Sequence, residues 1–445
     1  MPKLINEYLS ILDELKGDQD GRDAALAYLQ ASDVDAHGEP LNFSYVPYLV
    51  DKDLHDHFEY IASTIHGILT KIIDHYLKNE NYRKLFGYSK TLEDLIMLPC
   101  DYAQLLPMAR FDIFMDEESQ EFKFCEFNTD GTSCMSRDLI LGQALAQGDA
   151  FKSFCNRHKN VKNYELFDSW ANACLKDYFE CKNSCENPLV VIADFMDEHA
   201  TFSDFNRYKE AFERCGARAK VLDITSFKYD GNHLMDEDGE VVDVIYRRAV
   251  TCDIIDKIND CKALIDAVKD NNVCLVGHFR TTVVHTKTIN IMLFDEITRS
   301  FLTNEECEFI DKHCPKTFRL TSKIPIDLEE VSNNPNGWII KPEDDYGAKG
   351  VFAGPDFSKG QWAKIITSNI DKGYVLQEYA TQHTTDVMFT GRDLDNTTPV
   401  QKFNAMPGLY TYNGEFAGIY LRCGNEGVIA VDHNGLVKPA FKVDF

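Results

Sequence analysis

RFDIFMDEESQEFKFCEFN, residues 110–128, predicts a β-hairpin, because two runs of alternating apolar residues flank a polar turn. If the turn is centred on Ser119 with an odd number of loop residues, Asp112 lies opposite Glu126 and Arg110 lies opposite Asn128. Opposed residues share a face of the sheet, so these four polar side chains lie together. The other face then carries an apolar set, namely Phe111, Ile113, Met115, Cys125 and Phe127. A one-residue slip would mix the two faces, so this pattern favours the register.

The polar face of this hairpin has the composition of a metal site. Asp112, Glu126 and Asn128 offer two carboxylates and an amide oxygen, and such hard ligands suit Mg²⁺. Arg110 beside them could hold a phosphate or a carboxylate through two parallel hydrogen bonds. The alternative is a solvated sheet face with a surface ion pair. The apolar opposite face and the NTDGTS loop at 128–133 favour a site.

The rest of the chain predicts a mixed α/β protein in four regions. These are a helical N-terminal region (1–100), the hairpin with following helices (101–185), a small open α/β layer (186–285), and a C-terminal region that completes the core (286–445). The small layer rests on four short apolar strands, PLVVIADF (188–195), ARAKVLDI (217–224), DVIYRRA (243–249) and NVCLVG (272–277). It lacks a G-x-G-x-x-G fingerprint, which argues against dinucleotide binding.

Helices and turns complete this expectation. Helical patterns cover residues 1–15, 137–179, 203–216 and 286–301, and Gly216 is a candidate C-cap. The tail from 387 to 445 predicts strands separated by turns such as Asn413-Gly414 and Asn434-Gly435.

Composition and charge restrict the function classes. The 445 residues are 44% hydrophobic and 27% charged, an ordinary globular balance. The formal net charge of −26 argues against nucleic acid or an anionic membrane as the main partner, because both would be repelled.

The start MPKLINEYLSILDEL lacks the apolar core of a signal peptide, and no apolar run approaches the roughly 18 residues of a membrane span. The 14 cysteines form no CxxC pairs, so we expect reduced, mostly buried thiols in a cytoplasmic protein, with neither a disulfide framework nor a zinc site.

A second polar segment has the composition of a phosphate-binding element. WIIKPEDDYGAKG (338–350) reads as a strand that enters a glycine-bearing loop. Gly347 and Gly350 would let the backbone approach a phosphate, while Lys341 at the strand end and Lys349 in the loop add positive charge. The Walker A spacing is absent, and the alternative is a surface turn with two lysines.

Three further segments offer single candidates. HTKTINIMLFDE (285–296) places Lys287 at the start of a helix, and YVLQEYA (374–380) places Gln377 and Glu378 at a strand end, where they could read an adenine edge. In GIYLRCGNEG (418–427), Arg422 could stabilise a transferring phosphoryl group. The alternatives are a solvated lysine, an ordinary edge strand and a surface arginine.

In chain order, these segments resemble the glutathionylspermidine synthase family of circularly permuted ATP-grasp enzymes. That family has an early R-x-D strand, an E-x-N strand, a small α/β layer, a lysine before an apolar helix, a K-P strand with a glycine loop, and a late arginine. Their counterparts here are Arg110 with Asp112, Glu126 with Asn128, Lys287, Lys341 with Gly347, and Arg422. The match covers roughly residues 100 to 440.

The resemblance implies a role for each of these residues. Asp112, Glu126 and Asn128 would bind Mg²⁺. The ATP phosphates would be held by Lys287 and Lys341, with the glycine loop and Lys349 closing over them and Gln377 and Glu378 near the adenine. Near the acyl group and the γ-phosphate would lie Arg110, Ser133 and Arg422. The loop after Asn128 departs from the family at Gly131, and we see no N-terminal cysteine amidase domain, so hydrolytic activity is not expected.

The resulting hypothesis is an ATP- and Mg²⁺-dependent ligase that joins a small-molecule carboxylate to a small-molecule amine through an acyl phosphate. One alternative is another ATP-grasp reaction, such as peptide ligation or phosphorylation of a small molecule. Another is a catalytically degenerate fold member that binds nucleotide as a scaffold. A redox or metal protein built on the cysteines is a third alternative, and their irregular spacing argues against it.

Overall fold

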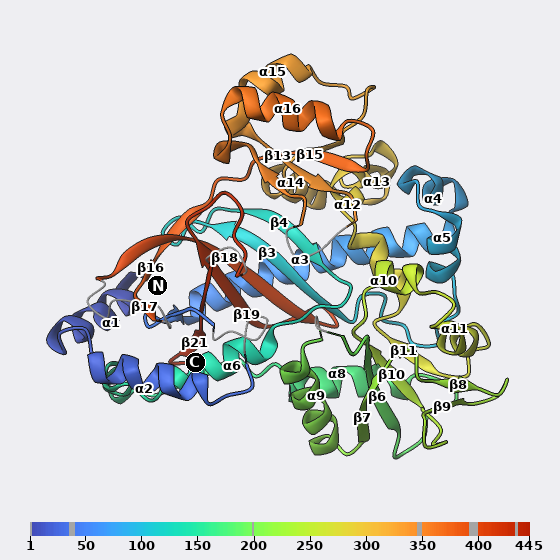
Figure 1. The fold of residues 1–445 in the computed structure, drawn as a ribbon, viewed down its shortest axis with the longest axis horizontal. Helices are drawn as coiled ribbons and strands as arrows, with labels where there is room; N and C mark the ends of the chain where they lie inside the picture. The colour runs from blue at the N-terminus through green and yellow to red at the C-terminus, as the bar shows by residue number, and fades with distance from the viewer. Residues whose placement is uncertain (1, 35–40, 198–199, 345–348, 391–398, 432–434) are drawn as a thin grey trace.

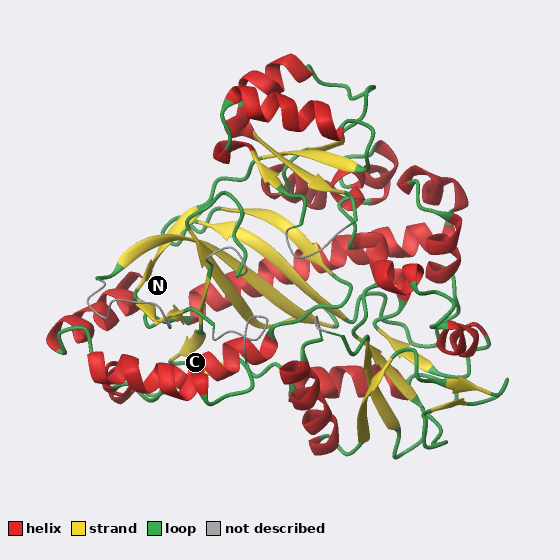
Figure 2. Cartoon of the chain, in the orientation of Figure 1, coloured by secondary structure: helices red, strands yellow, loops and turns green. Residues whose placement is uncertain are grey.

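A computed structural model describes residues 2–34, 41–197, 200–344, 349–390, 399–431 and 435–445. It contains a large central sheet, a small parallel sheet and a third, antiparallel sheet, each with its own helices (Figures 1 and 2). The expected mixed α/β class is confirmed. None of the helices in these residues is long and apolar enough to cross a membrane.

The central sheet brings together strands from both ends of the chain. Its order is β17-β1-β20-β19-β18-β3-β4, and β16 also pairs with β18. The bounds are β1 Phe43–Ser44, β3 Met108–Met115, β4 Phe122–Asn128, β16 His383–Val387, β17 Phe389–Thr390, β18 Gln401–Tyr412, β19 Glu415–Gly424 and β20 Leu436–Lys438. β18 and β19 form the hairpin expected around Asn413-Gly414, and both of these residues have positive φ. The Asn434-Gly435 turn lies partly outside the described residues.

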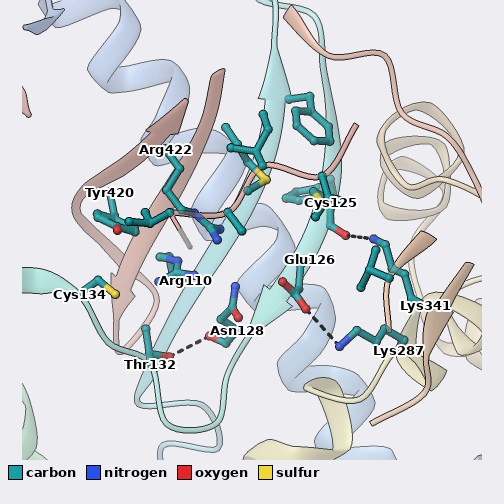
Figure 3. A pocket seen from close by; sticks show the side chains of 18 of the residues that line it. Arg110, Cys125, Glu126, Asn128, Thr132, Cys134, Lys287, Lys341, Tyr420 and Arg422 are labelled. Carbon is teal, nitrogen blue, oxygen red and sulfur yellow. Dashed lines mark hydrogen bonds and ion pairs between the residues drawn. The ribbon is translucent and has the colours of Figure 1, made fainter. Parts of the chain in front are cut away.

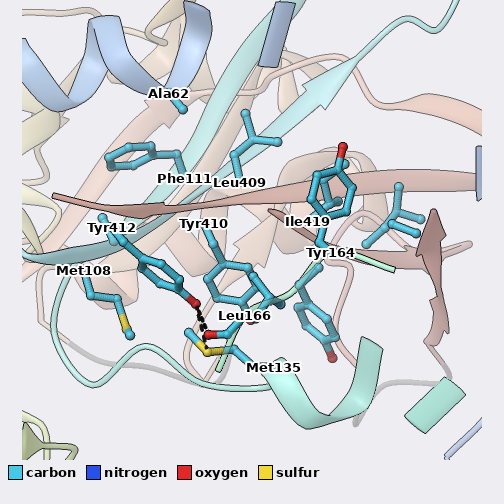
Figure 4. Close-up of a cluster of buried hydrophobic side chains, with 14 of the residues drawn as sticks. Ala62, Met108, Phe111, Met135, Tyr164, Leu166, Leu409, Tyr410, Tyr412 and Ile419 are labelled. Carbon is cyan, nitrogen blue, oxygen red and sulfur yellow. Dashed lines mark hydrogen bonds between the residues drawn. The ribbon is translucent and has the colours of Figure 1, made fainter. Parts of the chain in front are cut away.

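Both faces of the central sheet are covered. The long helix α3 (Lys52–Lys78) crosses one face, where Ala62 lies above Phe111 and Leu409 (Figure 4). Tyr412 points to the opposite face and donates from its hydroxyl to the Leu166 carbonyl at 2.7 Å. The hairpin is therefore held in a fully packed sheet, and the other elements of this body are α1 Pro2–Glu14, α2 Gln19–Gln30, α4 Glu80–Phe86, α5 Lys90–Ile96, α6 Met135–Leu145, α7 Asp149–Arg157 and α8 Asp168–Phe179.

The small α/β layer has the four strands that the sequence predicts, in one parallel sheet of order β11-β10-β6-β7. α9 ends at Arg214, and Gly216 has φ +91°, as a C-cap glycine does. The bounds are β6 Leu189–Asp194, α9 Phe202–Arg214, β7 Arg218–Asp223, β8 Lys228–Tyr229, β9 Leu234–Met235, β10 Val244–Arg247, α10 Thr251–Asp256, α11 Lys262–Lys269, β11 Cys274–Val276 and the 3₁₀ helix η1 Phe279–Val284.

The third sheet, at the top of Figure 1, has the order β12-β15-β13-β14 and is antiparallel. Trp362 of α16 packs in a core with Ile340 and Leu376. The bounds are α12 Thr288–Met292, α13 Glu296–Phe301, α14 Asn304–His313, β12 Thr317–Arg319, α15 Leu328–Asn333, η2 Pro335–Gly337, β13 Trp338–Pro342, β14 Phe352–Ala353, η3 Gly354–Asp356, α16 Lys359–Asn369 and β15 Tyr374–Glu378.

Three local predictions need correction. The N-terminal region also contains β1 and β2 (Tyr48–Val50), and the stretch 137–179 contains β5 (Val161–Asn163). β2 and β5 pair with β21 (Ala440–Val443) on either side, so their strand state depends on a partner from the chain end. The helix expected over 286–301 is split, because the Asp295 side chain caps a new helix by accepting from the Ile297 N–H.

Candidate active site

A cavity of about 330 Å³ lies between the β3–β4 hairpin, strands β18 and β19, and the inner strands β13 and β15 of the third sheet (Figure 3). Six cationic side chains line it among the described residues, namely Arg110, Arg137, Lys287, Lys341, Lys349 and Arg422. The lining carboxylates are Glu126, Asp130 and Glu378. A cationic cavity in a chain of net charge −26 is a local concentration of positive charge, which favours an anionic ligand.

The hairpin carries the predicted pairs. Arg110 pairs with Asn128, and Asp112 with Glu126. Beyond Asp112 the register shifts by one residue at a β-bulge.

The predicted odd-numbered turn is wrong, because six residues (116–121) separate the strands and the bulge makes up the difference. The Asp116 carboxylate organises this turn by accepting from the N–H groups of Glu118 and Ser119. The predicted placement of Cys125 on the opposite apolar face is also wrong. Because of the bulge, Cys125 lines the cavity beside Phe114.

Asp112 lies beneath the cavity wall and is fully buried. Its Oδ1 accepts from Arg110 Nε at 2.8 Å, and its Oδ2 accepts from Asn128 Nδ2 at 2.9 Å and from an Arg422 guanidinium nitrogen. Both carboxylate oxygens are therefore occupied by donors. To bind a metal ion, Asp112 would have to release at least its hydrogen bond with Arg422. In this structure the Asp112 carboxylate holds two arginines, Arg110 and Arg422, in place.

Glu126 faces the cavity and forms an ion pair with Lys287, with 3.2 Å between Oε1 and Nζ (Figure 3). Burial alone would raise the pKa of this carboxyl. The charges of Lys287, Lys341 and Arg422 outweigh burial and lower the pKa to about 2. Glu126 is thus an anion at any physiological pH, as a carboxyl group must be to bind a metal ion well.

Asn128 completes the oxygen-bearing wall. Its side-chain nitrogen donates to Asp112, so its amide oxygen is directed away from that carboxylate and is suited to a cation. Thr132 Oγ1 donates to the Asn128 backbone carbonyl at 3.0 Å and fixes the loop that follows (Figure 3). Glu126 and Asn128 therefore fit a divalent cation from the cavity side.

Lys341 is a buried link between the two sheets. Its Nζ donates to the Cys125 carbonyl at 3.1 Å and to Gln377 Oε1 at 2.9 Å. Gln377 in turn donates from Nε2 to Thr317 Oγ1 at 2.9 Å. The Gln377 amide is thus engaged on both sides, which leaves it in a supporting position behind Lys341.

The remaining nucleotide candidates lie at the cavity rim. Glu378 is exposed and accepts from the Lys316 backbone N–H at 3.0 Å. Lys349 is exposed and also lines the cavity. Gly347 lies outside the described residues. The wall here is apolar, with Ile339, Val351, Ala380, Met406 and Ile429, and such a slot suits a flat ring.

The far end of the cavity is an arginine cluster around Tyr420. The guanidinium carbons of Arg110 and Arg422 lie 5.4 and 5.8 Å from the centre of its ring, and Arg137 donates to its hydroxyl at 3.3 Å. Ser133 lines this end, and its carbonyl accepts from Arg110 Nη1 at 3.2 Å. Three guanidinium groups around one aromatic ring form a receptor for a carboxylate or a phosphoryl group.

Sequence reasoning missed Arg137, Cys134, His285 and Tyr420, all of which line the cavity. One signal was present for Arg137, which lies in the first turn of α6, where a positive charge opposes the helix dipole. Tyr420 carries no comparable signal, because an aromatic residue in a strand is ordinary.

No family model matches the sequence, and no curated protein matches it. Among solved structures, the chain is similar to a glutathione synthetase-like effector from Globodera pallida, with a TM-score of 0.60, 15% identity, and coverage of 96% of this chain and 97% of that one. A protein from Methylobacillus flagellatus assigned as a γ-glutamylcysteine synthetase gives a TM-score of 0.42 at 10% identity, over 85% of this chain and 84% of that one, and carries no further weight. The chain therefore shares the overall fold of a glutathione synthetase-like protein, which confirms the expected ATP-grasp-like fold class.

Proposed function

We propose that the protein is an ATP- and Mg²⁺-dependent carboxylate–amine ligase that forms an amide through an acyl phosphate. The observation that carries this proposal is the composition of the cavity. Its six cationic side chains surround a wall on which Glu126 and Asn128 present oxygen ligands. Anion binding beside a divalent-cation site is the arrangement that phosphoryl transfer requires.

Different parts of the cavity would bind the phosphates and the adenine of ATP. Lys287 and Lys341 would hold the phosphates, and Lys349 would approach from the rim. The apolar slot near Ile339 and Ile429 would take the adenine, and backbone groups of β15 would read its edge because Gln377 is engaged with Lys341. Glu126 and Asn128 would hold Mg²⁺, which would neutralise phosphate charge when bound.

The arginine cluster would position the substrate carboxylate against the γ-phosphate of ATP. A carboxylate held by Arg110 and Arg137 would face the γ-phosphate, which Arg422 would contact from the other side. The carboxylate oxygen attacks phosphorus and ADP leaves, so an acyl phosphate forms. An amine then attacks the acyl carbon, loses a proton and displaces phosphate. Guanidinium groups that are already held in place need no reorganisation as charge develops, and this is the main contribution that we assign to them.

A second candidate function is supported by the state of Asp112. Its carboxylate is fully buried and neutralised by two arginines, so one of the three expected metal ligands does not face the cavity. A nucleotide-binding scaffold without turnover would tolerate this arrangement. A different ATP-grasp reaction, such as peptide ligation or small-molecule phosphorylation, would use the same ATP half.

The test is a thermal-shift titration with ATP, with and without Mg²⁺, followed by an assay for ADP with carboxylate and amine pairs, glutathione with spermidine first. A ligand at about 100 times its Kd stabilises the fold by roughly 2.7 kcal/mol, which is easily detected. Lys341→Met should abolish the shift, whereas Lys364→Met, at an exposed position on α16, should leave it unchanged. A Mg²⁺-dependent shift with ADP release but no amide would identify another ATP-grasp reaction, and a shift without ADP would favour the scaffold. The absence of any shift would overturn nucleotide binding.

A further inference from the structure

Two cysteines lie in direct contact where the end of α8 meets the small α/β layer. Cys181 follows the end of α8, and Cys274 is the first residue of β11. Their sulfur atoms are 3.4 Å apart. All 14 cysteines are free thiols, of which five are buried, eight are partly buried and one is exposed, which corrects the expectation that most are buried.

The backbone holds both residues in place. The Cys181 N–H donates to the Tyr178 carbonyl at 2.9 Å, and the Cys274 N–H donates to the Asp243 carbonyl at 3.1 Å. The contact is therefore between a helix end and a sheet strand. A disulfide needs the sulfurs to approach to about 2.05 Å, which is a small movement from contact distance.

A second cavity gives small molecules access to this pair. It has a volume of about 610 Å³ and is lined by Cys100, Cys181 and Cys274. Its other walls include four asparagines, Asn183, Asn232, Asn271 and Asn272, so it is wettable. Cys181 is partly buried, while Cys274 is only 8% exposed. An incoming reagent therefore meets Cys181 first.

The two thiols share a hydrogen bond, and its effect differs between them. When Cys181 is ionised, the Cys274 S–H donates to it, and this bond is the largest influence that lowers the pKa of Cys181. The same bond and burial raise the pKa of Cys274. The more accessible sulfur is thus also the better thiolate, which is the arrangement of an attacking and a resolving cysteine.

We propose that Cys181 and Cys274 form a reversible disulfide by exchange with a low-molecular-weight disulfide that enters the second cavity. The Cys181 thiolate attacks one sulfur of the reagent and displaces one thiolate, giving a mixed disulfide. Cys274 then loses its proton and attacks the Cys181 sulfur, and the second reagent thiolate leaves. One disulfide is formed in the protein, one is reduced to two thiols, and the cross-link encloses residues 182–273, which hold three of the four strands of the small sheet.

The experiment treats the full chain with 2-hydroxyethyl disulfide, blocks the remaining thiols with N-ethylmaleimide, and maps disulfides by peptide mass spectrometry. A Cys185→Ser background removes the exposed cysteine, whose mixed disulfide would complicate the map. We expect a Cys181–Cys274 peptide pair that dithiothreitol separates. Cys100→Ser is the matched control, because Cys100 lines the same cavity, and it should leave the cross-link unchanged.

The single variants distinguish the steps. Cys274→Ser should trap Cys181 as the mixed disulfide, and Cys181→Ser should leave Cys274 unmodified at the same reagent concentration. A wild-type protein that stops at the mixed disulfide, pairs Cys181 with another cysteine, or leaves both thiols free would overturn the proposal. None of these readouts depends on nucleotide binding, so the proposal stands or falls separately from the ligase.

Discussion

Replacing Glu126 with glutamine removes one negative charge from the cavity while keeping the shape of the side chain. The pKa of Glu126 is lowered from 4.5 to about 2, and each pKa unit corresponds to 1.36 kcal/mol. The ion pairing therefore stabilises the folded protein by ~3 kcal/mol, or ~2 kcal/mol after allowance for solvent screening, because 32% of the side chain is exposed. Because the folded-state pKa is the lower one, this stabilisation is present above pH 4.5 and is lost as the pH falls towards 2.

The same variant should change ligand binding in two opposite directions. Mg²⁺ loses its anionic ligand, so the Mg²⁺-dependent part of ATP binding should disappear. Mg²⁺-free ATP meets one negative charge fewer in the cavity, and the repulsion removed is worth about 1 kcal/mol in water at 4 Å and about 4 kcal/mol near a protein surface. Mg²⁺-free ATP should therefore bind at least ~5-fold more tightly to Glu126→Gln than to the wild type.

Isothermal titration of both proteins with ATP, with and without Mg²⁺, measures these effects, and urea unfolding at pH 7 measures the stability change. Glu378→Gln is the matched control, because Glu378 also lines the cavity but is exposed and accepts a hydrogen bond from the Lys316 backbone N–H. It should leave the Mg²⁺ dependence unchanged. If Glu126→Gln keeps the full Mg²⁺ dependence, the metal assignment and the electrostatic reasoning are both refuted.

Three further predictions concern the scaffold around the site. Asp112→Asn should lower the free energy of unfolding by ~3–5 kcal/mol, because it leaves the buried guanidinium group of Arg110 uncompensated, and a loss under ~1 kcal/mol in urea unfolding would contradict this reasoning. Gly408→Ala places a methyl group 2.5 Å from Asp112 Oδ1 and should cost ~1–3 kcal/mol and weaken ATP binding, whereas Gly424→Ala, whose nearest neighbour would be 3.6 Å away, should do neither. Burial raises the pKa of Asp138 to about 7, so its ionisation destabilises the fold progressively from about pH 4 to pH 7; Asp138→Asn should gain stability over the wild type across that range, and urea unfolding at pH 5 and pH 8 should show the larger gain at pH 8.

Local patterns predicted what depends on local pairing. The opposition of Asp112 and Glu126 follows from alternation around one turn, and the strands of the small layer follow from short apolar runs with a helix between them. The bulge after Asp112 does not follow, because a bulge and a change in loop length compensate each other, and both leave the same alternation at the far end of the hairpin.

Long-range contacts decided the rest. Asp112 pairs with Arg422, which is 310 residues away in the sequence, as well as with Arg110 of its own strand, so no pattern within the hairpin could indicate this second ion pair. Gln377 is similarly occupied by Lys341 from a neighbouring strand. A polar residue at a strand end can face a ligand or support the residue that does, and only the packing of the strands decides between the two.

In the central sheet β18 lies between β3 and β19, although β3 comes far earlier in the chain, and this order has a consequence during synthesis. At ~5–20 residues per second, the ribosome makes Arg422 roughly 15–60 s after Asp112. Through that interval the β3–β4 hairpin lacks β18, its neighbour in the finished sheet, and one edge of β3 is unpaired. We therefore expect the nascent chain to be a chaperone client until the last strands emerge, and the cavity to be assembled in one late step.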